Sequence, residues 1–282
     1  MAPPHPIPYQ GSKRCLSGAI LATVGGRRPR RLFEPFAGSA AITLAAAEAR
    51  LAERFVVGDS LAPLMGIWRE ILAAPDRLAD AYERLWSAGD YGAVRAGYNR
   101  DCDPAALLYL LARCAKSAPR WSRAGAFNQS PDRRRTGRRP ERMRSELVAA
   151  SALLGGRTEL RAGDFEATIA DAGPDDLVYL DPPWQGTTDG RDKRYHQGLA
   201  RARLLAALAE LQRRAVPFLL SYDGRRGVRS YGEPLPPSLG LLRMELSGGR
   251  SSQATLHGRA EVTIESLYVW SPLSAGSGER GG

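Results

Sequence analysis

The sequence predicts an α/β fold: a Rossmann-like, mostly parallel sheet with an antiparallel hairpin at one edge and a helical insertion. Three observations predict this fold. Strands and helices alternate in two blocks, residues 31–59 and 160–222, as they do when helices cover a parallel sheet. Residues 60–159, between the blocks, are helical and then irregular. The last part of the chain has two β-rich stretches with no helix between them, which favours antiparallel pairing.

The first block reads as a strand, a turn, a helix and a second strand. Residues 32–36 form a short, mainly apolar run, and small residues follow it. Residues 41–54 are rich in Ala and Leu and predict a helix, with Ser39 available as its cap. Residues 55–59 predict a strand that ends in an acid, which completes a βαβ unit.

The inserted stretch and the second block follow the same logic. Apolar residues at three-to-four spacing predict helices over 63–72, 77–86, 104–116, 141–154 and 199–214. Residues 119–140 lose that periodicity and predict an extended basic loop. Apolar runs predict strands over 160–164, 176–181 and 217–222, followed by hairpin strands over 241–246 and 261–270.

This pattern divides the chain into parts. We expect residues 1–59 and 160–273 to form one domain around the sheet, and residues 60–159 to form the helical and loop insertion. Residues 274–282 are rich in Gly and Ser and predict a disordered tail.

Composition excludes several classes of protein. The 282 residues contain no apolar run of about 18–20 residues, the length of a membrane helix, and the start of the chain shows no signal peptide. The three cysteines and three histidines are too scattered for a disulfide framework or a zinc site. We therefore expect a cytoplasmic protein in a reducing setting, with no metal.

The charge balance favours an anionic partner. Lys and Arg number 40 against 30 Asp and Glu, which gives a net charge of +10. Only three of the 40 are lysines, and a coding sequence rich in G and C produces the same arginine bias. The charge is therefore informative only where it clusters.

A small-residue turn follows the first strand and predicts a nucleotide-type site. Gly38 lets the backbone approach a ligand closely, and Asp59, 21 residues later at the end of the next strand, can accept hydrogen bonds from a ribose. The phosphate-binding pattern G-x-G-x-x-G is absent, which favours a ligand with a ribose but no pyrophosphate. The alternative is a helix-packing glycine followed by an ordinary strand-end acid.

Asp181-Pro182-Pro183-Trp184 directly follows a buried strand, where α/β sheets bind ligands. The two prolines have no N–H and a fixed φ, so their carbonyl groups can point into a site. A carboxylate, a carbonyl and an aromatic plane together suit a planar ring with an exocyclic amino group. The alternative is a Pro-Pro turn with a packed Trp.

These two motifs, with Tyr9-Gln-Gly-Ser-Lys13 ahead of them, resemble those of the Dam-like DNA adenine-N6 methyltransferases, the D12 class or alpha group. Segments 127–128, 163–165 and 221–224 are also similar, so the resemblance runs from Tyr9 to about Tyr268. Two positions depart from the family pattern: Ala40 replaces a common Gly, and Trp184 replaces the usual Tyr.

The resemblance implies a Rossmann-like methyltransferase that moves a methyl group from S-adenosylmethionine to adenine N6 in duplex DNA, after the base is flipped out. Asp181 and the Pro182 carbonyl would accept the N6 hydrogens, and the base would stack on Trp184. The implied catalytic residues are Asp181, Pro182, Pro183 and Trp184. The implied cofactor residues are Tyr9, Lys13, Glu34, Phe36, Gly38, Ser39, Asp59, Asp164, Phe165 and Asp181.

Most of the net charge lies in residues 113–144, which we call the basic segment. It holds eleven basic and two acidic residues, +9 of the total +10. Arginine neutralises phosphates, and Arg, Asn and Gln read base edges, so this segment predicts DNA binding. The predicted contacts are Arg120, Trp121, Arg123, Asn128, Gln129, Arg133, Arg134, Arg135 and Arg138. The alternative is that the basic segment is only a solvated arginine-rich loop. A second loop, residues 248–253, is a further candidate for contact with DNA.

Other functions stay open on the sequence alone. An RNA or protein-amide methyltransferase could use the same Asp-Pro-Pro-Trp chemistry. A catalytically silent DNA-binding subunit of a restriction-modification system is a third possibility, although the intact motif argues against it. The missing phosphate loop excludes a nicotinamide oxidoreductase. We expect duplex DNA as partner, a separately acting restriction endonuclease, and a monomer when free.

Overall fold

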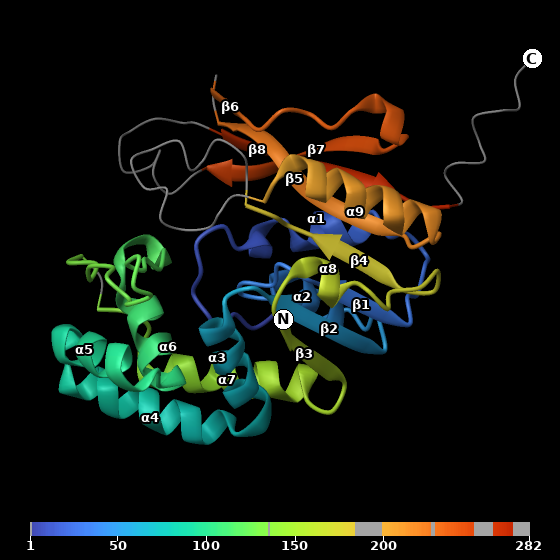
Figure 1. The fold of residues 1–282 in the computed structure, drawn as a ribbon. Helices are drawn as coiled ribbons and strands as arrows, with labels where there is room; N and C mark the ends of the chain where they lie inside the picture. Colours follow the sequence, from blue (N-terminus) through green and yellow to red (C-terminus); the bar gives the residue numbers. More distant parts are fainter. Residues whose placement is uncertain (1, 135, 184–198, 227–228, 251–261, 273–282) are drawn as a thin grey trace, which may run out of the picture.

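A computed structural model describes residues 2–134, 136–183, 199–226, 229–250 and 262–272 (Figure 1). One mixed sheet lies at its centre, with the strand order β3-β2-β1-β4-β5-β8-β7, and β6 (Arg229–Tyr231) pairs with β5. The other strands are β1 (Arg31–Glu34), β2 (Arg54–Asp59), β3 (Thr158–Ala162), β4 (Leu177–Leu180), β5 (Phe218–Arg226), β7 (Leu242–Arg250) and β8 (Val262–Trp270).

The strand directions confirm the predicted Rossmann-like fold class. Strands β1 to β5 are parallel, because β1 pairs with β2 and β4, β2 with β3, and β4 with β5, all in parallel. Strands β7 and β8 form the predicted antiparallel hairpin, which joins the sheet through β5.

The described helices include all of the predicted ones, with differences at their ends. They are α1 (Ser17–Ala22), α2 (Ala41–Glu48), α3 (Ala62–Ala73), α4 (Pro75–Ala88), α5 (Tyr91–Asp101), α6 (Pro104–Arg113), α7 (Pro140–Leu154), α8 (Phe165–Thr168) and α9 (Arg201–Arg213). Helix α2 ends earlier than predicted, since Arg50 takes a left-handed φ of 52°. Helices α1, α5 and α8 were not predicted; Asp90 caps α5 by accepting from the Ala93 N–H at 2.9 Å.

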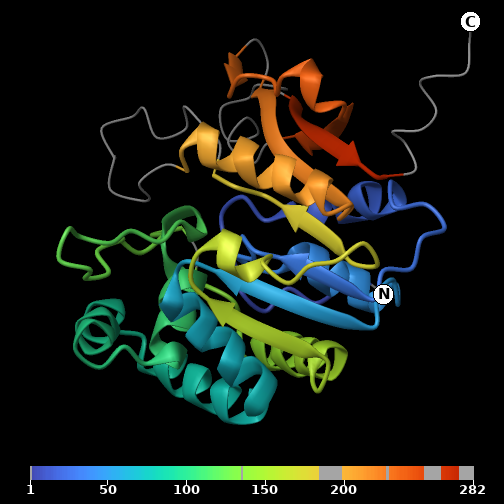
Figure 2. The ribbon, with the colours of Figure 1, turned by 45° about the vertical axis from the view of Figure 1, so that its right-hand side comes forward.

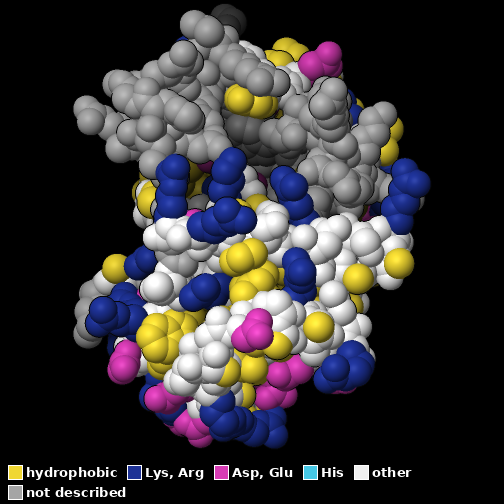
Figure 3. Space-filling model, turned by 90° about the vertical axis from the view of Figure 1, so that its left-hand side faces the viewer, with side chains coloured by type: hydrophobic (Ala, Val, Ile, Leu, Met, Phe, Trp, Pro, Cys, Tyr) yellow, Lys and Arg dark blue, Asp and Glu magenta, His cyan; other side chains and the backbone are white. Residues whose placement is uncertain are grey.

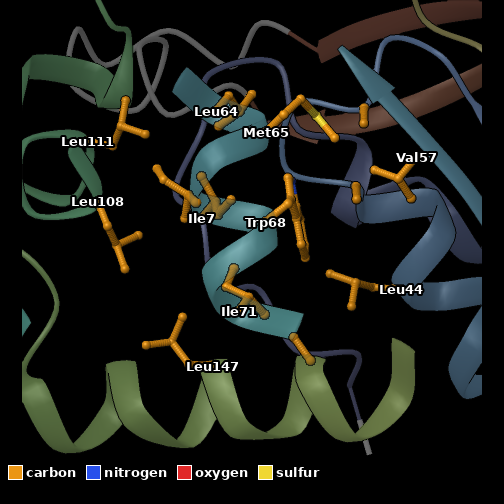
Figure 4. Packing of buried hydrophobic residues seen from close by; sticks show 14 of the residues in the cluster. Ile7, Leu44, Val57, Leu64, Met65, Trp68, Ile71, Leu108, Leu111 and Leu147 are labelled. Atoms are coloured by element: carbon orange, nitrogen blue, oxygen red, sulfur yellow. The ribbon is translucent and has the colours of Figure 1, made fainter. Parts of the chain in front are cut away.

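Alternate strand residues pack on opposite faces of the sheet. Leu32 and Val57 join the larger hydrophobic cluster, on the face that carries α2, α3, α6 and α7. Phe33 and Val56 join the smaller cluster, together with residues of α8 and α9. In Figure 4, α3 lies in the middle of the larger cluster, with α2 on one side and α7 below.

The inserted helices share this core with the sheet. Trp68 of α3 is buried on the side of Val57 of β2 and Leu44 of α2, while Leu147 of α7 packs below α3 (Figure 4). Helix α3 contacts β2 and β3, and α7 contacts α2. The predicted domain boundaries at residues 59 and 160 stay a prediction. The larger hydrophobic cluster contains residues from both sides of each boundary. Within the described residues, no helix has the length and apolar character needed to cross a membrane.

Candidate active site

The carboxyl ends of β1, β2, β3 and β4 meet at one edge of the sheet (Figures 1 and 2). This edge brings together the Gly38 turn, Asp59, Asp164 and Asp181, which lie far apart in the sequence. The N-terminal residues also reach it, since Lys13 pairs with Asp181. The N-terminal motif, the Gly38 turn with Asp59, and Asp181 therefore lie close together at this edge.

The Gly38 turn is held from three sides. Its N–H donates to Asp59 Oδ2 at 2.9 Å, and its carbonyl accepts from Trp68 Nε1 at 3.1 Å. A Cβ at this position would lie 3.3 Å from Tyr9 Cδ1, and φ is +51°, so glycine suits it on both counts. Tyr9 thus packs against the turn, and Trp68 is a buried contributor that no motif had indicated.

Ala40 and Ser39 explain how α2 begins. Ala40, the N-cap residue, has φ 47°, a left-handed conformation that costs a non-glycine residue about 1–2 kcal/mol. The Ser39 hydroxyl donates to Ser12 Oγ at 2.8 Å and makes no cap hydrogen bond, so the predicted Ser39 cap is wrong. Ser39 instead joins the turn to the N-terminal motif.

Glu34 supplies the missing cap from inside the protein. Its Oε2 accepts from the Thr43 N–H at 2.8 Å and from the Thr43 hydroxyl at 2.5 Å. The side chain is 3% exposed, and burial raises its pKa to about 7. Glu34 therefore fixes the first turn of α2, and its predicted contact with a cofactor stays a prediction.

The acids and aromatic residues of the predicted cofactor site already have partners. Asp59 Oδ1 accepts from the Leu61 N–H at 2.9 Å, so both of its oxygens orient backbone. The rings of Phe36 and Phe165 stack with centroids 5.1 Å apart. Asp164 caps α8 through the Glu166 N–H and pairs with Arg203 at 3.0 Å, and its pKa is lowered although burial opposes this.

Asp181 belongs to a largely buried ionic cluster around Lys13. Lys13 Nζ is 2.9 Å from Asp181 Oδ2 and 3.4 Å from Glu265 Oε2, and it donates to the Gly11 carbonyl at 3.3 Å. The Lys13 ammonium therefore points at Asp181, and its predicted contact with a cofactor stays a prediction. Glu265 lies on β8, and no motif had indicated it.

Burial and charge act in opposite directions on this cluster. Burial raises the pKa of Asp181 to about 6, Lys13 opposes this rise, and Glu265 adds to it. Burial by itself lowers the pKa of Lys13, but Asp181 and Glu265 outweigh it, so the pKa ends above its ordinary value. Lys13 is thus a permanent cation, and Asp181 is a carboxylate above about pH 6.

The residues after Asp181 are described only in part. Pro182 is buried and Pro183 is exposed, and the predicted Trp184 lies outside the described residues. The Asp181 side chain keeps 17% of its surface exposed, so a substrate can reach its free side. The described parts of the chain hold no group of His, Cys, Asp and Glu side chains that could bind a metal ion.

The basic segment folds as an anchored loop. Trp121 and Phe127 form an antiparallel bridge, and a turn over Ser122–Ala126 closes it, with the Ser122 N–H donating to the Ala126 carbonyl at 2.7 Å. The Asn99 side chain of α5 holds the Phe127 backbone, accepting from its N–H at 2.7 Å and donating to its carbonyl at 3.0 Å. The segment is therefore more ordered than the predicted extended loop.

Three predicted DNA contacts face the interior of this loop. Gln129 is buried and donates to the Ala118 carbonyl at 2.7 Å. Trp121 packs edge-on against Phe127, with centroids 5.3 Å apart. Arg138 is half-buried, and its guanidinium donates to the His5 carbonyl. Gln129, Trp121 and Arg138 therefore each make contacts within the protein, and their predicted DNA contacts stay predictions.

The other described candidates point outward: Arg120, Arg123, Asn128, Arg133 and Arg134 are exposed. Arg135 lies outside the described residues. The basic segment projects on the side where the parallel strands end (Figures 1 and 2). On that face Lys and Arg side chains gather across the middle, while Asp and Glu lie mostly toward the lower edge (Figure 3). A polyanion could therefore contact the protein beside Asp181.

A glycine turn after β1, an acid after β2 and an Asp-Pro-Pro motif after β4, on a parallel sheet, together define the class of Rossmann-like methyltransferases. The comparison with known families narrows this class. The model of the D12 class N6 adenine-specific DNA methyltransferases matches residues 9–233, and the chain belongs to that family.

One curated relative extends the comparison. A DNA N-6-adenine-methyltransferase of Escherichia phage P1 is 27% identical to this chain over an alignment of 219 positions, which covers 71% of the chain. The same region is 27% of the phage protein, so the chain spans only about a quarter of that relative's length. The family match includes Asp181 but ends before Glu265.

Proposed function

We propose that this protein transfers a methyl group from S-adenosylmethionine to N6 of adenine in duplex DNA. The observation that carries the proposal is the meeting of three motifs in one site: Lys13 lies 2.9 Å from Asp181, and Tyr9 packs on the Gly38 turn. Membership in an adenine-specific DNA methyltransferase family supports the same reaction.

The residues at the carboxyl edge fit the proposed methyl donor. Gly38 has φ +51°, and a Cβ added there would lie 3.3 Å from Tyr9 Cδ1. Because glycine has no side chain, the backbone at the start of α2 stays accessible to a ligand. Asp59, which holds the Gly38 turn, would also accept from a ribose, and the Phe36–Phe165 pair would offer an apolar surface for a base. Tyr9, Gly38, Asp59, Asp164 and the two phenylalanines would hold the donor, which when bound supplies a methyl group on a positively charged sulfur.

Asp181 and Pro182 would act on the target amino group. The lone pair of adenine N6 is delocalised into the ring, so the nitrogen is a weak nucleophile. Hydrogen bonds from N6 to the Asp181 carboxylate and the Pro182 carbonyl favour a more tetrahedral nitrogen with an available lone pair. When N6 forms its new bond to carbon it must release one hydrogen as a proton, and a carboxylate with a pKa of about 6 can accept it.

DNA would be held by the exposed part of the basic segment. Arg120, Arg123, Arg133 and Arg134 can neutralise phosphates, and Asn128 can contact a base edge. The target base must leave the helix to reach Asp181, and we propose that it stacks on Trp184. On this view residues 60–159 are the target-recognition part. A separate restriction endonuclease and a monomeric free state remain predictions.

The test is base-modification sequencing of DNA from a methylation-free host that expresses this chain. We expect N6-methyladenine at one short recurring sequence, and none in a host that expresses Asp181→Asn. Purified protein with labelled donor then separates the substrates, because duplex DNA should be labelled while RNA and protein are not. A folded protein that labels RNA or protein but no DNA would contradict the proposal.

A further inference from the structure

We propose that Glu265 is a positioning residue for methyl transfer, which shares the Lys13 ammonium with Asp181 and so keeps the Asp181 carboxylate a strong acceptor. The inference rests on the proposed function, because it assigns Asp181 to the target amino group. It adds a residue of β8, which lies beyond the stretch that matches the family model.

The geometry places Glu265 on the far side of Lys13. Its Oε2 is 3.4 Å from Lys13 Nζ, while Asp181 Oδ2 is 2.9 Å from the same nitrogen. This Glu265 oxygen is buried and makes no hydrogen bond to a described residue, so the ion pair with Lys13 is its main compensation. Glu265 pairs with Gly224 of β5, and the register of the β5–β8 ladder shifts between Ser221 and Gly224. Such an irregularity changes the direction of side chains near active sites.

The cost of this arrangement argues for a function. Asp181 by itself already neutralises Lys13, so a second carboxylate is not required to pair the buried ammonium. Burying an additional charge costs free energy that an apolar residue would not. Leu267, two residues further along β8, belongs to the larger hydrophobic cluster, and an apolar side chain at position 265 would extend it.

The consequence is a net negative charge within this cluster. Asp181, Glu265 and Lys13 together carry two negative charges and one positive charge. Among the described residues, Glu34 of β1 and Tyr179 of β4 also interact with Asp181, and neither adds a positive charge. As the target nitrogen gains its new substituent, positive charge builds up on it, and a fixed negative charge in a water-poor site stabilises that change.

The proposed role of Glu265 predicts the direction in which the pKa of Asp181 changes when the Glu265 charge is removed. Burial raises the pKa of Asp181 to about 6, and Glu265 raises it further against the opposing effect of Lys13. Without the Glu265 charge, the contribution that raises the pKa of Asp181 from that side is lost, so the pKa of Asp181 should fall. Because the carboxylate is the active form, the acid limb of the activity profile should then move to lower pH, even though turnover is slower.

The experiment compares wild type, Glu265→Gln and Glu265→Asp across pH 5–8. We expect Glu265→Gln to lower kcat by about 10–100-fold, to leave the KM for the donor within about threefold, and to move the acid limb down by about one pH unit. Glu265→Asp keeps the charge and should recover most of both effects. Glu245→Gln is the matched control, since Glu245 lies on neighbouring β7, is 44% exposed and pairs with Arg225.

A measurement without substrate separates this inference from the proposed function. The titration of Asp181, followed by carbon NMR of aspartate-labelled protein and assigned with Asp181→Asn, should shift to lower pH in Glu265→Gln. An unchanged Asp181 titration in folded Glu265→Gln would overturn the inference. If Glu265→Gln does not fold, Glu265→Asp decides the question. A folded Glu265→Asp with a kcat about tenfold or more below wild type, the loss expected for Glu265→Gln, would overturn the inference. A wild type that never methylates DNA contradicts the proposed function alone, because the NMR titration still reports the coupling.

Discussion

At the carboxyl edge of the sheet one buried ammonium, that of Lys13, lies between two carboxylates, whereas the basic segment carries eleven basic residues against two acidic ones. In the first region each charge has a defined partner at a defined distance. In the second, Arg123, Arg133 and Arg134 extend into solvent. Buried charges act through geometry and are weakly screened, while exposed charges act through their number and are screened by salt. The two regions should therefore respond differently to mutation.

The largest expected effect is in the buried region. Asp181→Ala should reduce methyl transfer by at least about a hundredfold, the scale seen when one electrostatic group of an active site is removed. The fold should persist, because Lys13 keeps its ion pair with Glu265. Initial rates together with thermal unfolding check both expectations, and near-normal turnover would remove Asp181 from the chemistry.

The next effect concerns the acid after β2. Asp59→Ala should weaken S-adenosylmethionine binding by about 1.5–3 kcal/mol, because a charged acceptor is removed and the Gly38 turn loses a hydrogen bond of 2.9 Å. Calorimetric titration measures this change in affinity. Asp101→Ala, a change of an exposed acid at the end of α5, is the control and should bind normally. Unchanged affinity in Asp59→Ala would leave that residue a purely structural role.

Two neighbours in the basic segment test the contrast between buried and exposed groups. Gln129→Ala removes the buried amide that holds the Ala118 carbonyl, and should lower the free energy of unfolding by about 1–3 kcal/mol. Asn128→Ala removes an exposed side chain, and should change stability by less than about 0.5 kcal/mol while weakening DNA binding. Denaturant unfolding and duplex binding distinguish the two. Equal decreases in stability would contradict the orientation of these side chains.

The smallest effect should come from the exposed arginines. Replacing Arg133, Arg134 and Arg135 by Ala should weaken binding to all duplexes and make the slope of log K against log salt shallower by about 0.9 for each phosphate that the variant no longer neutralises. Stability should not change. If one of these residues contacts a base, the variant should also lose about 1–3 kcal/mol of discrimination between bases at one position of the DNA recognition site. Wild-type affinity and slope would show that the run is only a solvated part of the loop.

Local patterns were sufficient for most of the fold. The strands at 31–34 and 177–180 and the long helices show periodicities that reflect burial on one face or on both. Ends were less predictable. Helix α2 was expected to run to residue 54, but it ends at Glu48, because the Ala-rich pattern does not mark where the chain must turn toward β2.

The site divides in the same way. Gly38, Asp59 and Asp181 could be predicted because each lies at or shortly after the carboxyl end of a strand, and parallel strands bring these ends to one edge. Glu265 and Trp68 could not, because they reach the site from β8 and α3 and carry no local motif. Within the basic segment, composition could not separate Gln129 from Asn128, since both are amides in the same polar run.

The sequence by itself therefore determined the class of fold, the strand-end positions of the motifs and the place where positive charge gathers, because these depend on residues close together in the chain. The tertiary structure decided which side chains of the basic segment face inward and that Lys13 lies between Asp181 and Glu265. Those outcomes depend on contacts between distant segments, where burial makes each polar group take whatever partner the packed fold brings within reach.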